Sequence, residues 1–186
     1  MNNTPFPEPL VFVQNTEICF PVYQFDLSNE IDIDDTISKI QKLKTVYPST
    51  TRTNVITETG WRSPYISFHE PEVQTFNDEI SVIQTKLNQI NSFQTKLINF
   101  WSVIYGKSDF SKSHNHFTLW DNMAYNTILY LTDSDTPIVF ETTRSPVEIF
   151  PKKGLLVVMH PLTKHSVPLV SDQSERIVLV CNFGVY

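Results

Sequence analysis

Apolar residues near the start of the chain fall into short runs bounded by turn formers. The runs at 10–13 and 18–23 predict two strands. Residues 32–43 instead repeat apolar side chains at three- and four-residue steps, which predicts a helix with Asp34 or Asp35 as its cap.

The clearest periodic segment follows a polar, turn-rich stretch at 49–76. Apolar side chains recur at helical spacing from Ile80 to Ile98. Asn77 suits the N-cap position because its side-chain oxygen can accept a hydrogen bond from a backbone amide of the first turn. The pattern therefore predicts a long amphipathic helix packed on a sheet.

The pattern changes after Phe100, where β-rich runs alternate with turn signals. Short antiparallel strands at this spacing favour a sandwich or jelly roll over a parallel sheet with crossover helices. We expect a mainly β fold with N-terminal helices, a double-stranded β-helix of the cupin-like jelly-roll type, packed against the long helix. The runs are 101–105, 125–131, 138–142, 147–150, 155–160, 166–170 and 176–185.

Composition limits the class of protein. The chain has 186 residues, of which 40% are hydrophobic and 12% aromatic, enough for one packed core. We predict a single domain over 1–186, in which 1–98 supplies supporting strands and helices and 99–186 forms the β core. The formal net charge of -6, without a basic cluster, disfavours binding to nucleic acid or to a membrane surface.

Two features of the sequence bear on location. Cys19 and Cys181 are the two cysteines and lie far apart, so the sequence indicates no disulfide framework. The first 13 residues lack a signal-peptide pattern, and no apolar run reaches the roughly 20 residues that cross a bilayer. We expect a soluble, cytoplasmic protein.

Histidines in the β-rich half carry the candidate chemistry. His114 and His116 are two residues apart, and alternate residues of a strand face the same side. His165 follows a later apolar strand. A jelly roll brings such distant strands together, so three imidazoles can converge on one divalent metal. Without a metal, these would be ordinary surface or core histidines.

Arg176 is the second feature, because it opens the apolar run 176–183. An arginine that faces inward there needs an anion, and its planar fork suits a carboxylate. Alternatively, Arg176 ends the strand at the surface or pairs with Asp172 or Glu175.

The segment from Trp101 to Phe183 resembles the iron(II)- and 2-oxoglutarate-dependent oxygenases, above all small members from bacteria and phages. In that group a Trp-bearing strand precedes a His-x-His pair, and a late His-x-Val-Pro string precedes Arg-Ile-x-x-x-x-Asn. Gly60-Trp61-Arg62-Ser63 is similar to an early string of the same group. The matching strings here are Trp101-Ser-Val-Ile-Tyr, His114-Asn-His116, Asn126-Thr-Ile-Leu-Tyr130-Leu, Pro151-Lys-Lys-Gly154-Leu-Leu-Val-Val, His165-Ser-Val-Pro168 and Arg176-Ile-Val-Leu-Val-Cys-Asn182.

The resemblance implies roles for these residues. His165 becomes the distal ligand of Fe(II), after His114 and His116. Arg176 becomes the residue that binds the far carboxylate of 2-oxoglutarate, with Tyr130 or Asn126 as hydrogen-bonding partners of the same cosubstrate.

Two departures from the group's pattern concern the site. The wider superfamily has an Asp or Glu where His116 stands, so either three histidines bind the metal or Asp121 supplies the carboxylate. Many members also have Ser or Thr at the position of Val178. The residues expected to line a substrate pocket are Trp101, Tyr105, Trp120 and Asn182.

The activity that the resemblance implies is a dioxygenase, or hydroxylase, that couples decarboxylation of 2-oxoglutarate to oxidation of a small-molecule or protein substrate by O2. A three-histidine cupin-type metalloenzyme without 2-oxoglutarate is one alternative. A non-catalytic β-sandwich binding or structural module is the other.

Overall fold

The computed structural model describes residues 11–15, 18–48, 60–91, 93–116, 122–142, 145–171 and 173–185. Three helices and twelve strands lie within these ranges. The helices are α1 (Ile33–Val46), α2 (Glu72–Thr75) and α3 (Asn77–Ile90). The strands are β1 (Val11–Asn15), β2 (Ile18–Asp26), β3 (Trp61–Arg62), β4 (Ile66–Ser67), β5 (Thr95–Tyr105), β6 (Ser111–His114), β7 (Met123–Tyr130), β8 (Ile138–Phe140), β9 (Val147–Ile149), β10 (Leu155–Met159), β11 (His165–Val167) and β12 (Arg176–Val185).

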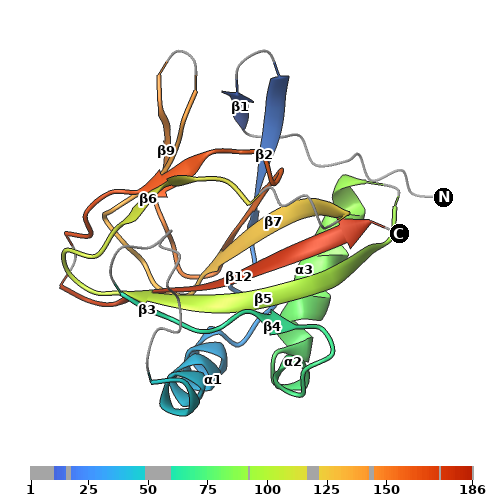
Figure 1. Ribbon diagram of the computed structural model, residues 1–186, viewed down its shortest axis with the longest axis vertical. Helices are drawn as coiled ribbons and strands as arrows, with labels where there is room; N and C mark the ends of the chain where they lie inside the picture. Colours follow the sequence, from blue (N-terminus) through green and yellow to red (C-terminus); the bar gives the residue numbers. More distant parts are fainter. Residues whose placement is uncertain are drawn as a thin grey trace.

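The strands form two antiparallel sheets. The larger has the order β1-β2-β10-β7-β12-β5-β3, with β4 also paired to β5. The smaller has the order β6-β11-β8-β9. Figure 1 shows β7, β12 and β5 side by side, with the helices on one side of them and β6 and β9 on the other. The mainly β class with antiparallel sheets is confirmed, and it is consistent with a jelly roll.

Both faces of the larger sheet are buried. Ile177 and Leu179 of β12 belong to the core cluster that includes the helices, whereas Val178 and Val180 belong to a second cluster shared with the smaller sheet. Since successive side chains of a strand point to opposite faces, a strand covered on both sides reads as a continuous apolar run. This explains the unbroken apolar sequence of β12.

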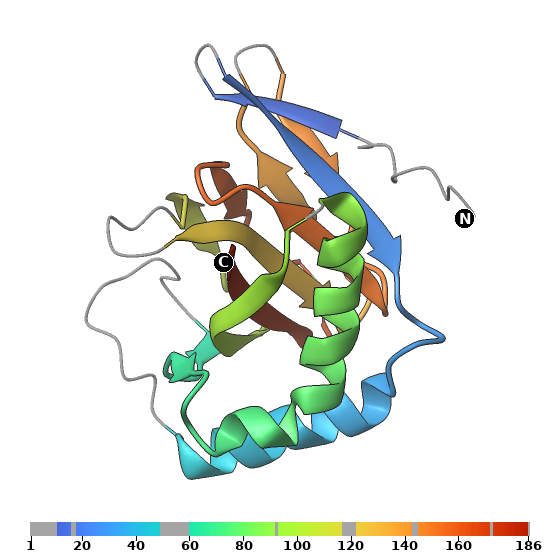
Figure 2. The ribbon, with the colours of Figure 1, turned by 90° about the vertical axis from the view of Figure 1, so that its right-hand side faces the viewer.

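The helices lie on the outer face of the larger sheet (Figure 2). Ile83 and Leu87 of α3 are fully buried in the same cluster as Ile40 of α1. Glu79 of α3 is buried as well, and its Oε1 lies 2.9 Å from Lys39 Nζ of α1. This pairing compensates the buried carboxylate and joins the two helices.

The predicted long helix is too long at its C-terminal end. It stops at Ile90, and Leu97 and Ile98 of the apolar stripe belong to β5 instead. Asn91 explains the stop, because its Nδ2 donates to Leu87 O at 3.1 Å and its Oδ1 accepts from Phe93 N at 2.6 Å. An asparagine side chain that bonds the backbone in this way replaces the helical hydrogen bonds.

The predicted helix caps were also wrong. Asp32, rather than Asp34 or Asp35, caps α1 by accepting the backbone N–H of Asp35 at 3.0 Å. Asn77 is the first residue of α3, and the cap position is Phe76, without a side-chain cap bond. Short elements β3, β4, α2 and β6 are additional to the prediction, because their lengths carry no periodic signal.

No helix in the described ranges is long and apolar enough to cross a membrane.

Gly154 joins the ends of three strands. It has φ +89°, its N–H donates to Tyr130 O and its carbonyl accepts from Leu27 N, both at 2.8 Å. A Cβ at this position would lie 2.7 Å from the backbone N and Cα of Ser28. Position 154 therefore requires glycine for two reasons: its φ is positive, and the backbone of Ser28, just after β2, leaves no room for a Cβ.

We expect Gly154→Ala to lower the free energy of unfolding by about 2 kcal/mol, because left-handed backbone strain and the clash with Ser28 add together. Urea denaturation measures the change. Gly106→Ala is the control, since its nearest atom, Asp109 Oδ2, lies at an ordinary 3.5 Å. Equal midpoints for the two variants would contradict this account.

Candidate metal centre

His114 and His165 are directly opposite one another in the smaller sheet. His114 is the last residue of β6, and its Cα partner in β11 is His165. Side chains of directly opposed residues lie on the same face of an antiparallel pair. The two ring centroids are accordingly 4.4 Å apart.

His116 reaches the same place from a different backbone position. It lies just beyond the end of β6 rather than within the strand, and it lines the same cavity as His114. The backbone N–H of His116 instead donates to Pro161 O at 2.8 Å, which ties it to the turn before β11. The ring of His116 lies 5.1 Å from that of His165 and 5.5 Å from that of Trp101.

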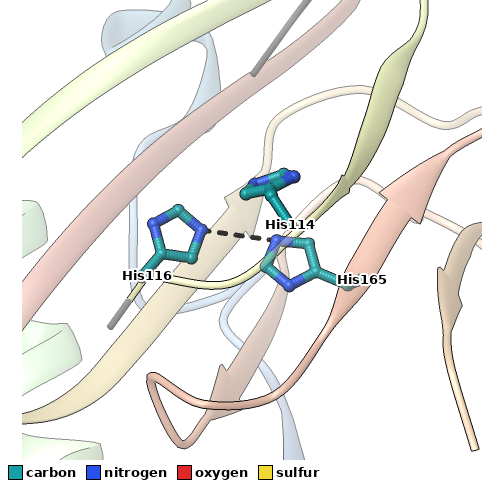
Figure 3. Close-up of side chains that lie close together, drawn as sticks. All are labelled: His114, His116 and His165. Atoms are coloured by element: carbon teal, nitrogen blue, oxygen red, sulfur yellow. Dashed lines mark hydrogen bonds between the residues drawn. The ribbon is translucent and has the colours of Figure 1, made fainter. Parts of the chain in front are cut away.

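The three rings converge (Figure 3). The Nε2 atoms of His116 and His165 are 3.4 Å apart, and one ligand atom from each histidine lies within 4.8 Å of the others. Two nitrogens that bind one ion at about 2.1 Å are separated by no more than about 4.2 Å. The Nε2 atoms of His116 and His165 already lie within this limit.

Hydrogen bonds fix the tautomer of two rings. Nδ1 of His114 lies 2.7 Å from Lys112 O, and Nδ1 of His165 lies 3.1 Å from Thr163 O. A carbonyl oxygen only accepts, so each Nδ1 must carry the proton and each Nε2 has a free lone pair. Histidines that bind metals show the same arrangement, with the second ring nitrogen donating to a carbonyl or carboxylate.

Burial favours the neutral form of these imidazoles. His165 is 3% exposed, and its burial lowers its pKa to about 3, with a smaller contribution from His114. Burial also lowers the pKa of His114, and the positive charge of Arg62 acts in the same direction. Neutral imidazole is the form that binds a metal.

The histidines line a cavity between the two sheets. Of the other residues predicted for the site, Arg176, Tyr130, Trp101 and Tyr105 line it too. Aliphatic side chains from the larger sheet, including Val178, line it as well. The complete lining is Arg62, Trp101, Val103, Tyr105, Ser111, His114, His116, Ile128, Tyr130, Ile138, His165, Val167, Arg176, Val178 and Val180.

Arg176 points inward and is 1% exposed, so it does not end β12 at the surface. Its Nη1 donates to Thr136 O at 2.6 Å, while its Nε finds no partner at ordinary hydrogen-bonding geometry among the described residues. Its guanidinium carbon lies 5.3 Å from the ring centroid of Tyr130 and 5.7 Å from that of Tyr105. Glu175 is exposed and lies 3.7 Å from Lys44 instead.

Tyr130 contributes a second buried polar atom. Its hydroxyl also lacks a partner at ordinary geometry among the described residues. Burial raises the pKa of Tyr130 to about 12, although the nearby charge of Arg176 opposes the shift. The neutral phenol is therefore a donor beside the guanidinium, and the two together suit a carboxylate.

Other predicted residues are not among those that line the cavity. Asn126 Nδ2 donates to Asn182 Oδ1 at 2.8 Å, and Asn182 Nδ2 donates to Asn99 Oδ1 at 2.9 Å. These amides form a row across β7, β12 and β5, in which Asn126 and Asn182 are buried and Asn99 is half-buried. Trp120 and Asp121 lie outside the described residues, as does Asp172.

Arg62 is a lining residue that the sequence did not assign to the site. It lies on β3, is 4% exposed, and its guanidinium carbon is 4.7 Å from the ring centroid of Trp101. The available signal was the string Gly60-Trp61-Arg62-Ser63, but a two-residue strand gives no periodic indication of which side chain points inward.

No protein-family model and no curated protein matches the sequence. Solved structures do match. A Burkholderia pseudomallei oxidoreductase of the 2OG-Fe(II) oxygenase family has 13% identity and a TM-score of 0.66, over 88% of this chain and 84% of that one. A Pseudomonas putida prolyl-4-hydroxylase has 15% identity and a TM-score of 0.62, over 88% and 91%.

A viral collagen prolyl hydroxylase from Paramecium Bursaria Chlorella virus-1, solved as a 2OG complex, has 14% identity and a TM-score of 0.63. The match covers 87% of this chain and 94% of that one. With identities this low, the likeness concerns the fold: the chain has the fold of these oxygenases.

Proposed function

We propose that the protein is an Fe(II)- and 2-oxoglutarate-dependent dioxygenase that hydroxylates its substrate. The observation that carries the proposal is one cavity that holds three convergent imidazoles and a buried, incompletely bonded arginine. The shared fold with a 2OG-Fe(II) oxygenase and with a prolyl hydroxylase solved with 2OG supports it.

His114, His116 and His165 would hold the metal. Imidazole suits Fe(II) as well as other divalent transition metals, and three ligands from one side leave positions open for cosubstrate and O2. Asp121 is the alternative carboxylate ligand. The backbone carbonyls of Lys112 and Thr163 keep two rings oriented by accepting their Nδ1 protons.

Arg176 and Tyr130 would bind the far carboxylate of 2-oxoglutarate. Arg176 Nε and the Tyr130 hydroxyl lack partners at ordinary hydrogen-bonding geometry among the described residues, and a carboxylate supplies two acceptor oxygens. Tyr130 is preferred to Asn126 for this role because Tyr130 lines the cavity, whereas the Asn126 amide is bonded to Asn182. The aliphatic lining of the cavity, Val178 included, would exclude water from the bound molecule.

Bound Fe(II) and 2-oxoglutarate supply the oxidising chemistry, in which decarboxylation to succinate accompanies oxidation of the substrate by O2. The chain provides binding, orientation and a dry cavity. Trp101 and Tyr105 would form part of the pocket wall beside the reacting groups.

A three-histidine metalloenzyme without 2-oxoglutarate is the second candidate, and the neutral ligand set favours it. This second candidate gives no role to the buried guanidinium of Arg176 in the same cavity. The behaviour of Arg176 variants therefore separates the two.

Anaerobic Fe(II) should raise the melting temperature of the protein, because a metal that binds only the folded state stabilises it. His165→Ala should abolish the increase. His69→Ala is the matched control, since His69 is exposed and is not part of the histidine cluster. An Fe(II)-dependent increase that survives in His165→Ala would rule out the proposed centre.

Variants at the third ligand position should identify the triad. We expect His116→Ala to weaken Fe(II) binding by more than about 100-fold, since loss of even an outer-shell partner costs about 10–100-fold. Asp121→Ala should bind Fe(II) like the unaltered protein. Calorimetric titration measures the Fe(II) affinity of both variants. Weakened binding in Asp121→Ala with unchanged binding in His116→Ala would assign the ligand role to Asp121.

Arg176→Met should retain Fe(II) binding and weaken 2-oxoglutarate binding by about 100-fold or more, because a carboxylate loses a charged hydrogen-bonding partner. The measurement is anaerobic titration of the Fe(II) protein with 2-oxoglutarate, followed by the metal-to-ligand charge-transfer band. Glu175→Gln, an exposed neighbour, is the control. An unchanged band in Arg176→Met would favour the candidate that needs no 2-oxoglutarate.

A further inference from the structure

We propose that Thr132 and Thr136 are positioning residues for Arg176, which hold its side chain so that one edge of the guanidinium remains available to a carboxylate. Both threonines lie in the connection between β7 and β8, residues 131–137. This inference rests on the proposed function, because it concerns how the chain prepares Arg176 for the far carboxylate of 2-oxoglutarate.

The ladder between β7 and β12 stops short of Arg176. Its outermost pair on this side is Val178 with Tyr130, and one further backbone bond joins Leu131 N to Ile177 O at 3.0 Å. On the opposite edge of β12, Arg176 is still paired with β5. Regular strand pairing therefore supports the backbone of Arg176 on its β5 side, and the β7 side needs a different support.

Thr132 supplies that support with its side chain. Its Oγ1 donates to Glu175 O at 3.1 Å and accepts from Ile177 N at 3.0 Å. These two groups belong to the peptide units directly before and after Arg176, so one hydroxyl fixes both. A threonine hydroxyl can do this because it has one donor and two acceptor sites. The side chain of Thr132 thus takes the place of a backbone ladder bond beside the arginine.

Thr136 holds the other end of the arginine side chain. Its carbonyl accepts from Arg176 Nη1 at 2.6 Å, and Pro137 O lies 3.4 Å from the same nitrogen. Thr136 is buried, and its Oγ1 accepts from the backbone N–H of Ser171 at 3.1 Å. The carbonyl that orients the guanidinium is therefore tied in turn to the connection between β11 and β12.

These contacts determine which edge of the guanidinium is available. Nη1 of Arg176 is bonded to backbone carbonyls, whereas its Nε has no partner at ordinary geometry among the described residues. A carboxylate binds a guanidinium best through two adjacent N–H groups. The edge that carries Nε is accordingly the one offered to a ligand. Because the side chain is already fixed, binding there costs less conformational entropy than binding to a mobile arginine.

The test measures 2-oxoglutarate binding to the Fe(II)-loaded protein by anaerobic titration of the charge-transfer band. Thr132→Val removes the hydroxyl, so Glu175 O and Ile177 N lose their partner. We expect the 2-oxoglutarate Kd to rise about ten-fold, the order of effect of losing one hydrogen bond that supports a binding group. The Fe(II) Kd should stay within about three-fold, because the histidines lie on other strands.

Two further variants separate positioning from a general loosening of the sheet. Thr132→Ser keeps the hydroxyl and should restore the 2-oxoglutarate Kd to within about three-fold of the unaltered protein. Thr127→Val is the matched control, because Thr127 Oγ1 donates to Cys181 O at 3.2 Å and so joins the same two strands away from Arg176. It should lower the melting temperature and leave the 2-oxoglutarate Kd unchanged.

Three results would overturn the inference: an unchanged 2-oxoglutarate Kd in Thr132→Val, an equal rise of that Kd in Thr127→Val, or a failure of Thr132→Ser to restore binding. If Thr132→Val does not fold, Thr136→Val takes its place. This variant removes the acceptor of the Ser171 N–H and should raise the 2-oxoglutarate Kd in the same way.

A measurement without ligands distinguishes failure of this inference from failure of the proposed function. Hydrogen exchange of the Ile177 amide, relative to that of Leu179 in the same strand, should be faster in Thr132→Val than in Thr132→Ser. Equal exchange in the two variants would show that Thr132 does not support Arg176. Accelerated exchange in Thr132→Val, with no binding of Fe(II) or 2-oxoglutarate by the unaltered protein, would instead contradict the proposed function alone.

Discussion

The pairing of β6 with β11 is the constraint on which the metal centre depends. It sets His114 opposite His165, although the two residues are far apart in sequence. A slip of one residue in either strand would turn one ring to the outer face of the smaller sheet, because side chains alternate with a period of two. Phe140 of β8 flanks His165 on its other side and limits such a slip.

The larger sheet supplies Arg176 and Val178 to the cavity, because successive side chains of β12 point to opposite faces of the sheet. On β12, Arg176 and Val178 face the cavity while Ile177 and Leu179 pack under the helices. Helix packing therefore fixes the orientation of the arginine indirectly: a rotation of the strand that exposed Arg176 would also remove Ile177 from its core. The Tyr130 carbonyl bonded to Gly154 holds the neighbouring strand in register.

The sequence predicted those parts of the site that rest on strand periodicity or on motif strings. His114 was identified by its two-residue spacing from His116, His165 by its position after an apolar run, and Arg176 because it opens one. His116 reached the expected cluster for a different reason, a backbone bond to Pro161 that no local pattern encodes. Arg62 was missed because two-residue β3 is defined by its partner β5, a contact between distant segments. The helix ending at Asn91 was missed because side-chain bonds to the backbone override an apolar stripe.

The net charge of the chain and the charge of Arg176 have opposite signs. The formal net charge is -6, whereas Arg176 places a buried guanidinium in the lining of the cavity. Long-range attraction to the protein as a whole therefore cannot concentrate 2-oxoglutarate at the site, and exposed charges are screened beyond about 10 Å at ordinary salt. Buried charges are screened far less, so Arg176 would act on the cosubstrate only after its entry into the cavity. A neutral triad would favour the binding of this dianion, since a carboxylate ligand in place of His116 would add a negative charge to the same cavity.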